Sequence, residues 1–167
     1  RTFVQSATPM GEQQFDMTFM LKNPDVSGFG SWSAVEGWNG DNMNVAGWGV
    51  RAQHNAAQTG ETSGDAFFEC YADGVLPDGL WAIYQTVNLS SGFYTMRLAT
   101  FAGPVNNVPG TGEAKVALYA GEKRGDEVKS TALAYREVSF CQSTEEEVRL
   151  GVKTEEGNLA NWIGCND

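Results

Sequence analysis

Hydrophobic and polar positions alternate most regularly over residues 81–97, WAIYQTVNLSSGFYTMR. Before a short Asn-Ser-Ser-Gly break, the residues that share one face are Ile83, Gln85, Val87 and Leu89. After the break, the residues that share one face are Tyr94, Met96 and Leu98. Side chains of a strand point to opposite faces in turn, so this pattern predicts two half-buried strands rather than a helix.

Further short segments of the same kind follow one another along the chain. They are residues 15–21, 47–53, 66–71, 113–120, 133–140 and 148–154, with a last strand starting at Trp162. Turns rich in Gly, Asn and Asp separate them, and residues 103–112 read as a loop. About eight to ten short strands without a convincing helix predict an all-β fold, an antiparallel sandwich of the jelly-roll type. We expect residues 1–15 to be a leader or linker and residues 16–167 to form the sandwich.

The length and net charge limit the classes of partner that this chain is expected to bind. The chain has 167 residues, enough for one domain with a proper core, and its formal net charge is −10. Binding to nucleic acid or to an anionic membrane depends on cationic side chains, so this charge argues against both. No apolar run approaches the roughly 20 residues that span a bilayer, which argues against membrane insertion.

The three cysteines are Cys70, Cys141 and Cys165. An odd number leaves at least one thiol unpaired. Two alternatives stay open: three buried or half-buried small apolar residues, or one disulfide whose pair the sequence does not identify.

The familiar motifs of catalysis are missing from the sequence. It has no Gly-x-Ser-x-Gly, no His-Glu-x-x-His, no P-loop and no Gly-x-Gly-x-x-Gly. We therefore expect a protein that is not an enzyme. Two acidic residues that are distant in sequence could still converge in a glycosidase site.

The order of several segments resembles a known superfamily. These are a strand ending in Asn-Pro-Asp, a Trp-rich glycine loop, AFFE, IYQTVNLSSGFYTM, KVALYA and VRLGVKTEEGNLANWIGCND. From Asp16 to Asp167 the chain resembles the galactose-binding-domain-like β-sandwiches, a jelly-roll superfamily. It looks closest to accessory domains of secreted or surface-attached proteins of gut Bacteroidetes. The family continues past its last Gly with Phe-Asp-Asn and a closing strand, and this sequence departs from that pattern with Cys165-Asn166-Asp167.

The resemblance implies a non-catalytic carbohydrate-binding module of a larger secreted or cell-surface protein. Its partners would be a glycan and the other domains of the parent protein. The alternative is a structural or protein-interaction sandwich that binds no glycan. Ligand contacts would come from the loops at residues 38–55, 103–112 and 157–161.

Two tryptophans and two polar residues are candidate contacts in the first of these loops. Trp38 and Trp48 lie among Gly and Asn residues, and exposed rings there could stack on a sugar. The alternative for each ring is a place in the core. Arg51 and His54 form a polar cluster near Trp48. His54, the only histidine, could equally be an ordinary surface residue.

The last candidates follow from the resemblance alone. Asn158 matches the loop amide that often binds a sugar hydroxyl in related modules, although it could instead cap a turn with Gly157. Sandwiches of this type often hold a structural calcium ion, for which Asp25 and Asn166 are the candidate ligands. The alternative is that both are plain turn residues. No other cofactor is expected.

Overall fold

The computed structural model describes residues 3–7, 14–24, 36–41, 47–52, 66–71, 82–104, 115–128, 134–156 and 161–166. One short 3₁₀ helix lies among them, η1 (Thr18–Met20). The strands are β1 (Phe3–Ala7), β2 (Gln14–Asp16), β3 (Asn39–Asp41), β4 (Gly47–Ala52), β5 (Ala66–Tyr71), β6 (Ala82–Leu89), β7 (Gly92–Pro104), β8 (Lys115–Ala120), β9 (Lys123–Glu127), β10 (Ala134–Gln142), β11 (Glu146–Glu156) and β12 (Asn161–Asn166).

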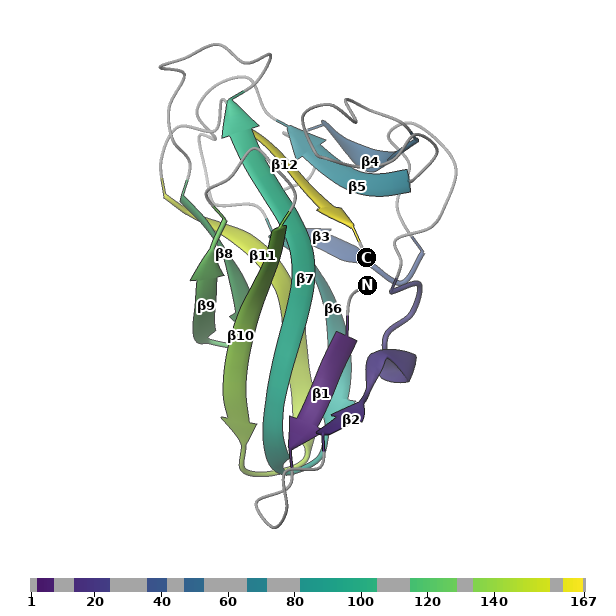
Figure 1. The fold of residues 1–167 in the computed structure, drawn as a ribbon, viewed down its shortest axis with the longest axis vertical. Coiled ribbons are helices and arrows are strands. Elements are labelled where there is room, and N and C mark those ends of the chain that lie inside the picture. Colours follow the sequence, from purple (N-terminus) through teal and green to yellow (C-terminus); the bar gives the residue numbers. More distant parts are fainter. Residues whose placement is uncertain are drawn as a thin grey trace.

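The strands form two sheets that pack against each other (Figure 1). Sheet A has the order β2-β1-β7-β12-β5-β4, with β10 also paired to β7, and sheet B has the order β3-β6-β11-β8-β9. Every strand pair in the described part is antiparallel. The all-β antiparallel sandwich predicted from the sequence is confirmed.

Strand β7 is the axis of sheet A. One of its edges pairs with β10 over Gly92–Thr100. Its other edge pairs first with β1, over Phe93–Arg97, and then with β12, over Ala99–Pro104. The strands β1 and β12 therefore follow each other along a single edge of β7 (Figure 1).

The core lies between the sheets and consists of the alternate positions that the sequence pattern predicts. Along β6 the burial alternates from Ile83 to Leu89, and along β7 the side chains of Tyr94, Met96 and Leu98 are buried. One apolar cluster joins both sheets, and its buried members are Leu21, Trp38, Ile83, Val87, Leu89, Tyr94, Met96, Leu98, Val116, Leu118, Ala120, Val128, Val138, Val148, Leu150 and Val152. The predicted facing of β6, β7 and β11 is confirmed.

Gln85 is the polar exception on the inner face of β6, and it bonds to backbone outside the sheet. Its Nε2 donates to the carbonyl oxygen of Lys22 at 2.7 Å, and the backbone N–H of Lys22 donates to its Oε1 at 3.0 Å. The amide thus pairs with Lys22 as a neighbouring strand would. A buried amide is tolerated because both of its polar atoms are satisfied.

The segment that Gln85 holds is tied down from two further sides. The indole N–H of Trp38 donates to the carbonyl oxygen of Asn23 at 3.1 Å. Gly37 lies against Lys22 with a φ of +84°, and a Cβ on Gly37 would stand 2.5 Å from the Cβ of Lys22. Only glycine fits there, because both the φ and the close approach exclude a side chain.

The amino-terminal residues depart from the expected leader over residues 1–15. Residues 3–7 form β1, which pairs with β7 from Phe3↔Arg97 to Ala7↔Phe93, and residues 14–16 form β2. Pro9 and Gly11, which suggested a linker, belong to the connection between these two strands. A five-residue strand of mixed polarity gives little periodic signal, and its pairing with β7 is a tertiary effect.

We predict that replacing Gln85 with Met, which keeps the volume but not the hydrogen bonds, lowers the free energy of unfolding by about 2 kcal/mol, because two backbone groups of Lys22 lose their partners. Urea unfolding measures the change. The control is Thr86→Val at the exposed neighbouring position, which should stay within about 0.5 kcal/mol of the parent. Equal midpoints for the two variants would contradict the role given to Gln85.

Candidate functional site

The two ends of the sandwich differ in how their strands are connected. At one end the links have two to six residues: residues 90–91 join β6 to β7, residues 143–145 join β10 to β11 and residues 8–13 join β1 to β2. At the other end, residues 72–81 join β5 to β6, residues 105–114 join β7 to β8, and residues 157–160 join β11 to β12. We call this second end, at the top of Figure 1, the long-connection end. Binding sites in β-sandwiches form preferentially where long connections cluster.

The interior changes character as the strands approach the long-connection end. The inner face of β7 runs through Met96 and Leu98 to Thr100, and that of β11 runs through Val152 to Thr154. Both threonine side chains are 0% exposed. They are the last inward side chains that the structure describes on β7 and β11, so each facing sheet carries one buried hydroxyl group at this level, beside apolar residues such as Val116.

The two threonines differ in their partners. Thr154 takes part in an interaction within the protein. The hydroxyl oxygen of Thr100 has no hydrogen-bond partner in the part of the chain that the structure describes. Burying a hydroxyl without a partner costs roughly 1–3 kcal/mol. The hydroxyl oxygen of Thr18 in η1 is also buried without a partner, but the Thr18 residue is partly exposed, whereas Thr100 is fully buried between the sheets.

A polar cluster on the outer face of sheet B fixes the edge strand β3, and we call it the Asp41 clamp. The hydroxyl of Tyr84 donates to Oδ1 of Asp41 at 3.2 Å, and Nη1 of Arg149 donates to Oδ2 at 3.1 Å. The guanidinium of Arg149 also lies 4.3 Å from the centre of the Tyr84 ring. These contacts join β3, β6 and β11.

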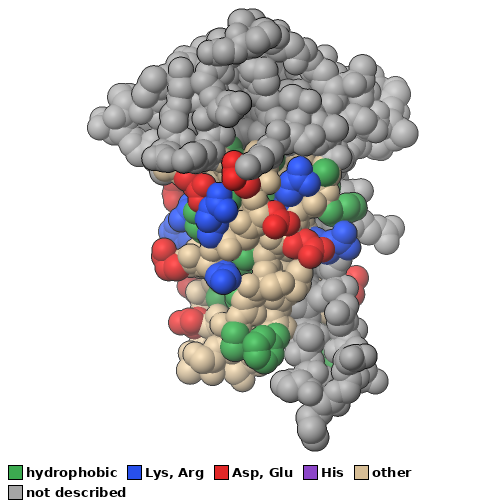
Figure 2. Space-filling view, turned by 60° about the vertical axis from the view of Figure 1, so that its left-hand side comes forward, with side chains coloured by type: hydrophobic (Ala, Val, Ile, Leu, Met, Phe, Trp, Pro, Cys, Tyr) green, Lys and Arg blue, Asp and Glu red, His purple; other side chains and the backbone are tan. Residues whose placement is uncertain are grey.

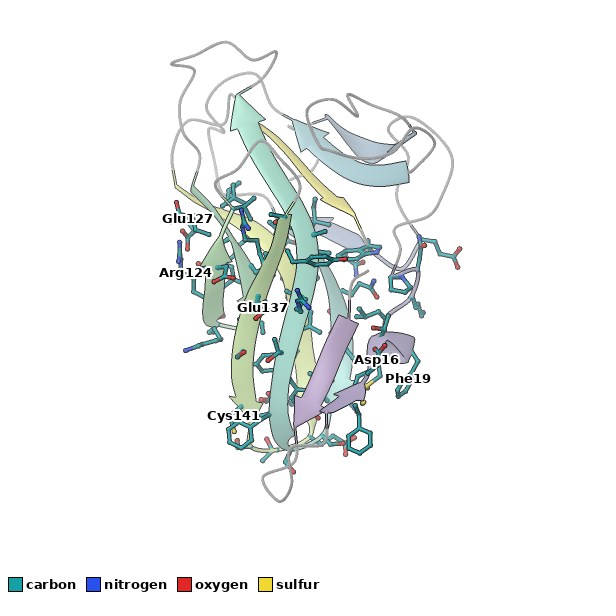
Figure 3. The ribbon with its side chains drawn as sticks, in the orientation of Figure 1. Asp16, Phe19, Arg124, Glu127, Glu137 and Cys141 are labelled. Atoms are coloured by element: carbon teal, nitrogen blue, oxygen red, sulfur yellow. The ribbon has the colours of Figure 1, made fainter. Side chains whose placement is uncertain are left out.

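The Glu155 clamp does the same for the edge strand β9. The hydroxyl of Tyr119 donates to Glu155, and Nη2 of Arg124 donates to Oε2 of Glu155 at 2.8 Å. The ammonium of Lys153 lies 3.8 Å from the centre of the Tyr119 ring. Figure 3 shows Arg124 beside Glu127, with which it also forms an ion pair of 3.7 Å.

Glycine separates the two clamps. Gly151 of β11 is in register with Tyr84 of β6 on one side and Tyr119 of β8 on the other. A Cβ on Gly151 would stand 2.0 Å from the carbonyl oxygen of Ile83, so the close approach of β6 requires glycine. Gly151 is buried, although its neighbours in register have partly exposed side chains.

The electrostatics of the clamps suit a structural role better than proton transfer. Burial, with a further contribution from Asp41, raises the pKa of Tyr84 above its ordinary value. Burial and the hydrogen bond to Glu155 likewise raise the pKa of Tyr119. The hydrogen bond to Glu155 raises the pKa of Arg124 still further above its ordinary range. At neutral pH both phenols therefore keep their protons and Arg124 keeps its charge.

The rest of the described surface carries charges of both signs. Figure 2 shows Lys and Arg intermixed with Asp and Glu over one face, with a small apolar group near its lower end. On the outer face of sheet A, Nε of Arg97 lies 2.7 Å from Oε1 of Glu137.

One predicted ligand contact, Trp38, is part of the core. Its side chain is 8% exposed and packs in the apolar cluster, and its indole N–H donates to the carbonyl oxygen of Asn23. The core alternative given for this tryptophan is thus where the structure places it. Its ring has no open face for stacking.

Two other predicted contacts lie on β4, and one predicted calcium ligand lies on β12 at its end away from the long connections. Trp48 and Arg51 belong to β4, where Arg51 is in register with Phe67. Asn166 ends β12, in register with Ala99. Their backbone positions are described, and their side chains lie outside the described part. His54, Asn158 and Asp25 lie outside the described residues altogether.

Trp48 and Thr100 are linked through the register of sheet A. Trp48 is in register with Cys70 of β5, which is in register with Ile163 of β12. Ile163 is in turn in register with Ala102 of β7. Ala102 follows Thr100 by two residues on the same strand, so both positions belong to the same face of sheet A. The position of Trp48 is therefore on that face too, in the row of residues next to the row of Thr100.

The described residues bear on the predictions made for metal binding, membrane insertion and the cysteines. Within the described residues, no three His, Cys, Asp or Glu side chains are grouped as metal ligands, and the calcium site stays a prediction. No helix in those residues is long and apolar enough to span a bilayer. The thiol of Cys141 is unpaired and exposed, not buried or half-buried, and it lies near the short-link end (Figure 3).

Comparison with known proteins identifies the fold. No protein-family model matches the chain, and no curated protein matches it in sequence. The Stig cyclase Fisc from Fischerella sp. TAU, solved in complex with (3Z)-3-(1-methyl-2-pyrrolidinylidene)-3H-indole, matches with a TM-score of 0.54 and 14% identity. That match covers 98% of this chain and 94% of the cyclase.

Two further structures give the same result. A cyclase from Fischerella sp. TAU in complex with 4-(1H-indol-3-yl)butan-2-one has a TM-score of 0.55 and 15% identity, covering 81% of this chain and 84% of the other. The apo form of a cyclase from Fischerella sp. has a TM-score of 0.55 and 13% identity, covering 90% of each chain. At such identities the likeness establishes the fold.

These matches overturn the functional expectations drawn from the sequence. The resemblance to carbohydrate-binding accessory domains of Bacteroidetes proteins is wrong, because the matching structures are Fischerella cyclases. The predictions of a non-catalytic module, of a purely structural sandwich and of a glycan partner are wrong for the same reason. The neighbours are enzymes, and two of them hold small indole compounds. The predicted secreted or cell-surface location is not tested by these matches.

The error has a physical cause. Alternating strands and turn residues specify a sandwich, and sandwiches host many unrelated functions. The motifs that are absent report nucleophiles, phosphate loops and metal ligands, and their absence does not exclude enzymes that lack those motifs. Thr100 is not among the residues predicted from the sequence, although continuing the alternation of Tyr94, Met96 and Leu98 by one step places it on the inner face of β7.

We predict that the clamps make the protein less stable in alkali. A phenol whose pKa is raised on folding contributes stability that is complete below its unfolded pKa of about 10 and is lost as the pH rises through its folded pKa. The double variant Tyr84→Phe/Tyr119→Phe should lose about 1 kcal/mol per site at pH 8 and show a shallower decline as the pH rises above about 10.

Urea midpoints measured across this pH range give the slopes. Thr86→Val, a change without a titrating group on the same outer face, is the control and should keep the slope of the parent. If the double variant declines as steeply as the parent, the two phenols do not account for the alkaline loss.

Proposed function

We propose that this protein is an enzyme of the cyclase type, which binds a small, largely apolar, ring-containing molecule and promotes its ring closure. The observation that carries the proposal is the fold match, which extends over 98% of this chain and 94% of a cyclase in complex with an indole compound. A match over nearly the whole length of both chains concerns the complete sandwich rather than one motif.

Ring closure suits a rigid sandwich because the reacting atoms belong to one molecule. The enzyme then has mainly to hold that molecule in the folded shape that reacts, and such positioning alone lowers barriers substantially. The close-packed cluster between the sheets provides stiff walls, and the two clamps hold the edge strands β3 and β9. These features support a preorganised ligand site.

We place the ligand at the long-connection end. The buried apolar cluster occupies the interior beneath Thr100 and Thr154. The proposed aromatic contact is Trp48, whose indole can stack on a planar ring system. Of the polar residues predicted from sequence, Arg51 and Asn158 would orient the ligand.

His54 is the proposed proton carrier. It is the only histidine of the chain, and imidazole titrates near neutral pH, where ring closures that need a proton shift require such a group. The clamp phenols are unsuited to this task, because burial raises their pKa values.

We predict that the protein binds 4-(1H-indol-3-yl)butan-2-one with a dissociation constant of about 1 mM or below, as expected for a compound of this size. Isothermal titration gives the affinity. Amide shifts in NMR should cluster in residues 99–104 and 161–166, beside the long-connection end, and not at the 90–91 turn. The Trp48→Ala variant should bind several-fold more weakly, because a stacking partner is removed.

The control compound is butan-2-one, which has the ketone without the ring and should not bind. Failure of the folded protein to bind either indole compound held by its structural neighbours would count against the proposal. Shifts spread evenly over the surface would count against the site.

A further inference from the structure

Thr100 differs from the other buried polar side chains in the described part of the chain, which are Gln85, Gln142 and Thr154. Gln85 has both ends of its amide bonded to Lys22, and Nε2 of Gln142 donates to the carbonyl oxygen of Thr144 at 3.0 Å. Thr154 also has an interaction partner. Thr100 is 0% exposed, and its hydroxyl has no partner among the described residues.

The surroundings of Thr100 give its hydroxyl no compensation. On β7 the preceding inward residue is Leu98, and in register with Thr100 lie Ala134 of β10 and Cys165 of β12. Valine has nearly the shape of threonine and would fill the same space without a polar atom to desolvate. A hydroxyl at such a position is costly unless something binds to it.

The position of Thr100 indicates what binds. It is the last described inward side chain of β7 before the long-connection end, and its strand leads directly to residues 101–104 and β12. A ligand that entered between the sheets from that end would meet the hydroxyl of Thr100 before the apolar side chain of Leu98. The hydroxyl can donate one hydrogen bond and accept others.

We propose that Thr100 is a ligand-binding residue whose hydroxyl pairs with a single polar atom at the buried end of the substrate. The inference rests on the proposed function and narrows its substrate class. The substrate is an apolar ring compound that carries one hydrogen-bonding atom, such as a carbonyl oxygen or a ring nitrogen, at the end that enters the sandwich. A pure hydrocarbon of the same shape would leave the hydroxyl unpaired and bind less well.

The experiment combines stability and binding in the variant Thr100→Val. Without ligand, its urea midpoint should equal or exceed that of the parent, because no internal hydrogen bond is lost. The matched control is Thr154→Val, the same change at an equally buried position whose threonine has a partner, and its midpoint should fall. A clear fall for Thr100→Val would show that its hydroxyl has a structural partner and would overturn the inference.

The binding arm uses two probes of similar shape, 4-(1H-indol-3-yl)butan-2-one and 3-butylindole, which lacks the ketone. We expect Thr100→Val to bind the ketone about 5- to 30-fold more weakly than the parent, which corresponds to one lost hydrogen bond. If the ketone is the paired atom, 3-butylindole should bind equally to both proteins. If the indole nitrogen is the paired atom, both probes should weaken together.

The outcomes separate the inference from the proposal beneath it. If the parent binds neither probe, the proposed function fails, and the inference fails with it. If the parent binds the probes and Thr100→Val binds each of them as tightly as the parent does, the inference alone is overturned. A loss that is specific to the variant, combined with an unchanged urea midpoint, supports both.

Discussion

The pairing between the Gln85 amide and the backbone of Lys22 is the interaction on which the arrangement of the sandwich depends. The side chain of Gln85, buried on the inner face of β6, forms two hydrogen bonds of 2.7 and 3.0 Å with the backbone of Lys22, which lies outside the sheet. The segment held in this way carries Asn23, which accepts the indole N–H of Trp38. The Gln85 amide therefore helps to position Trp38 in the apolar core.

A division of labour follows along the length of the sandwich. The half nearest the short links is packed mainly with apolar side chains, together with the hydrogen-bonded Gln142. Towards the other end the inner faces carry Thr100 and Thr154, while the Asp41 and Glu155 clamps hold the edge strands from outside. The stability provided by the apolar cluster offsets the cost of burying the hydroxyl of Thr100.

Sequence reasoning succeeded where burial imposes a strict period and failed where tertiary pairing decides. The inward set of Gln85, Tyr94 and their neighbours could be read directly, because a strand with one buried face must alternate. Strand β1 was hidden in the supposed leader, because its partner β7 lies far along the chain. Thr100 is an ordinary residue by pattern, and only its missing partner in the described part makes it notable. The functional class was misjudged because patterns report the fold and not its use.

The edge of β7 that is shared by β1 and β12 has a dynamic consequence. The two ladders use different residues of β7, Phe93–Arg97 and Ala99–Pro104, so losing one removes no hydrogen bond from the other. The sheet can therefore open in two separate units, with β12, β5 and β4 leaving β7 together while β1 stays paired. Because β12 borders the long-connection end, local opening there would admit a ligand to the interior without unravelling the half that carries the core.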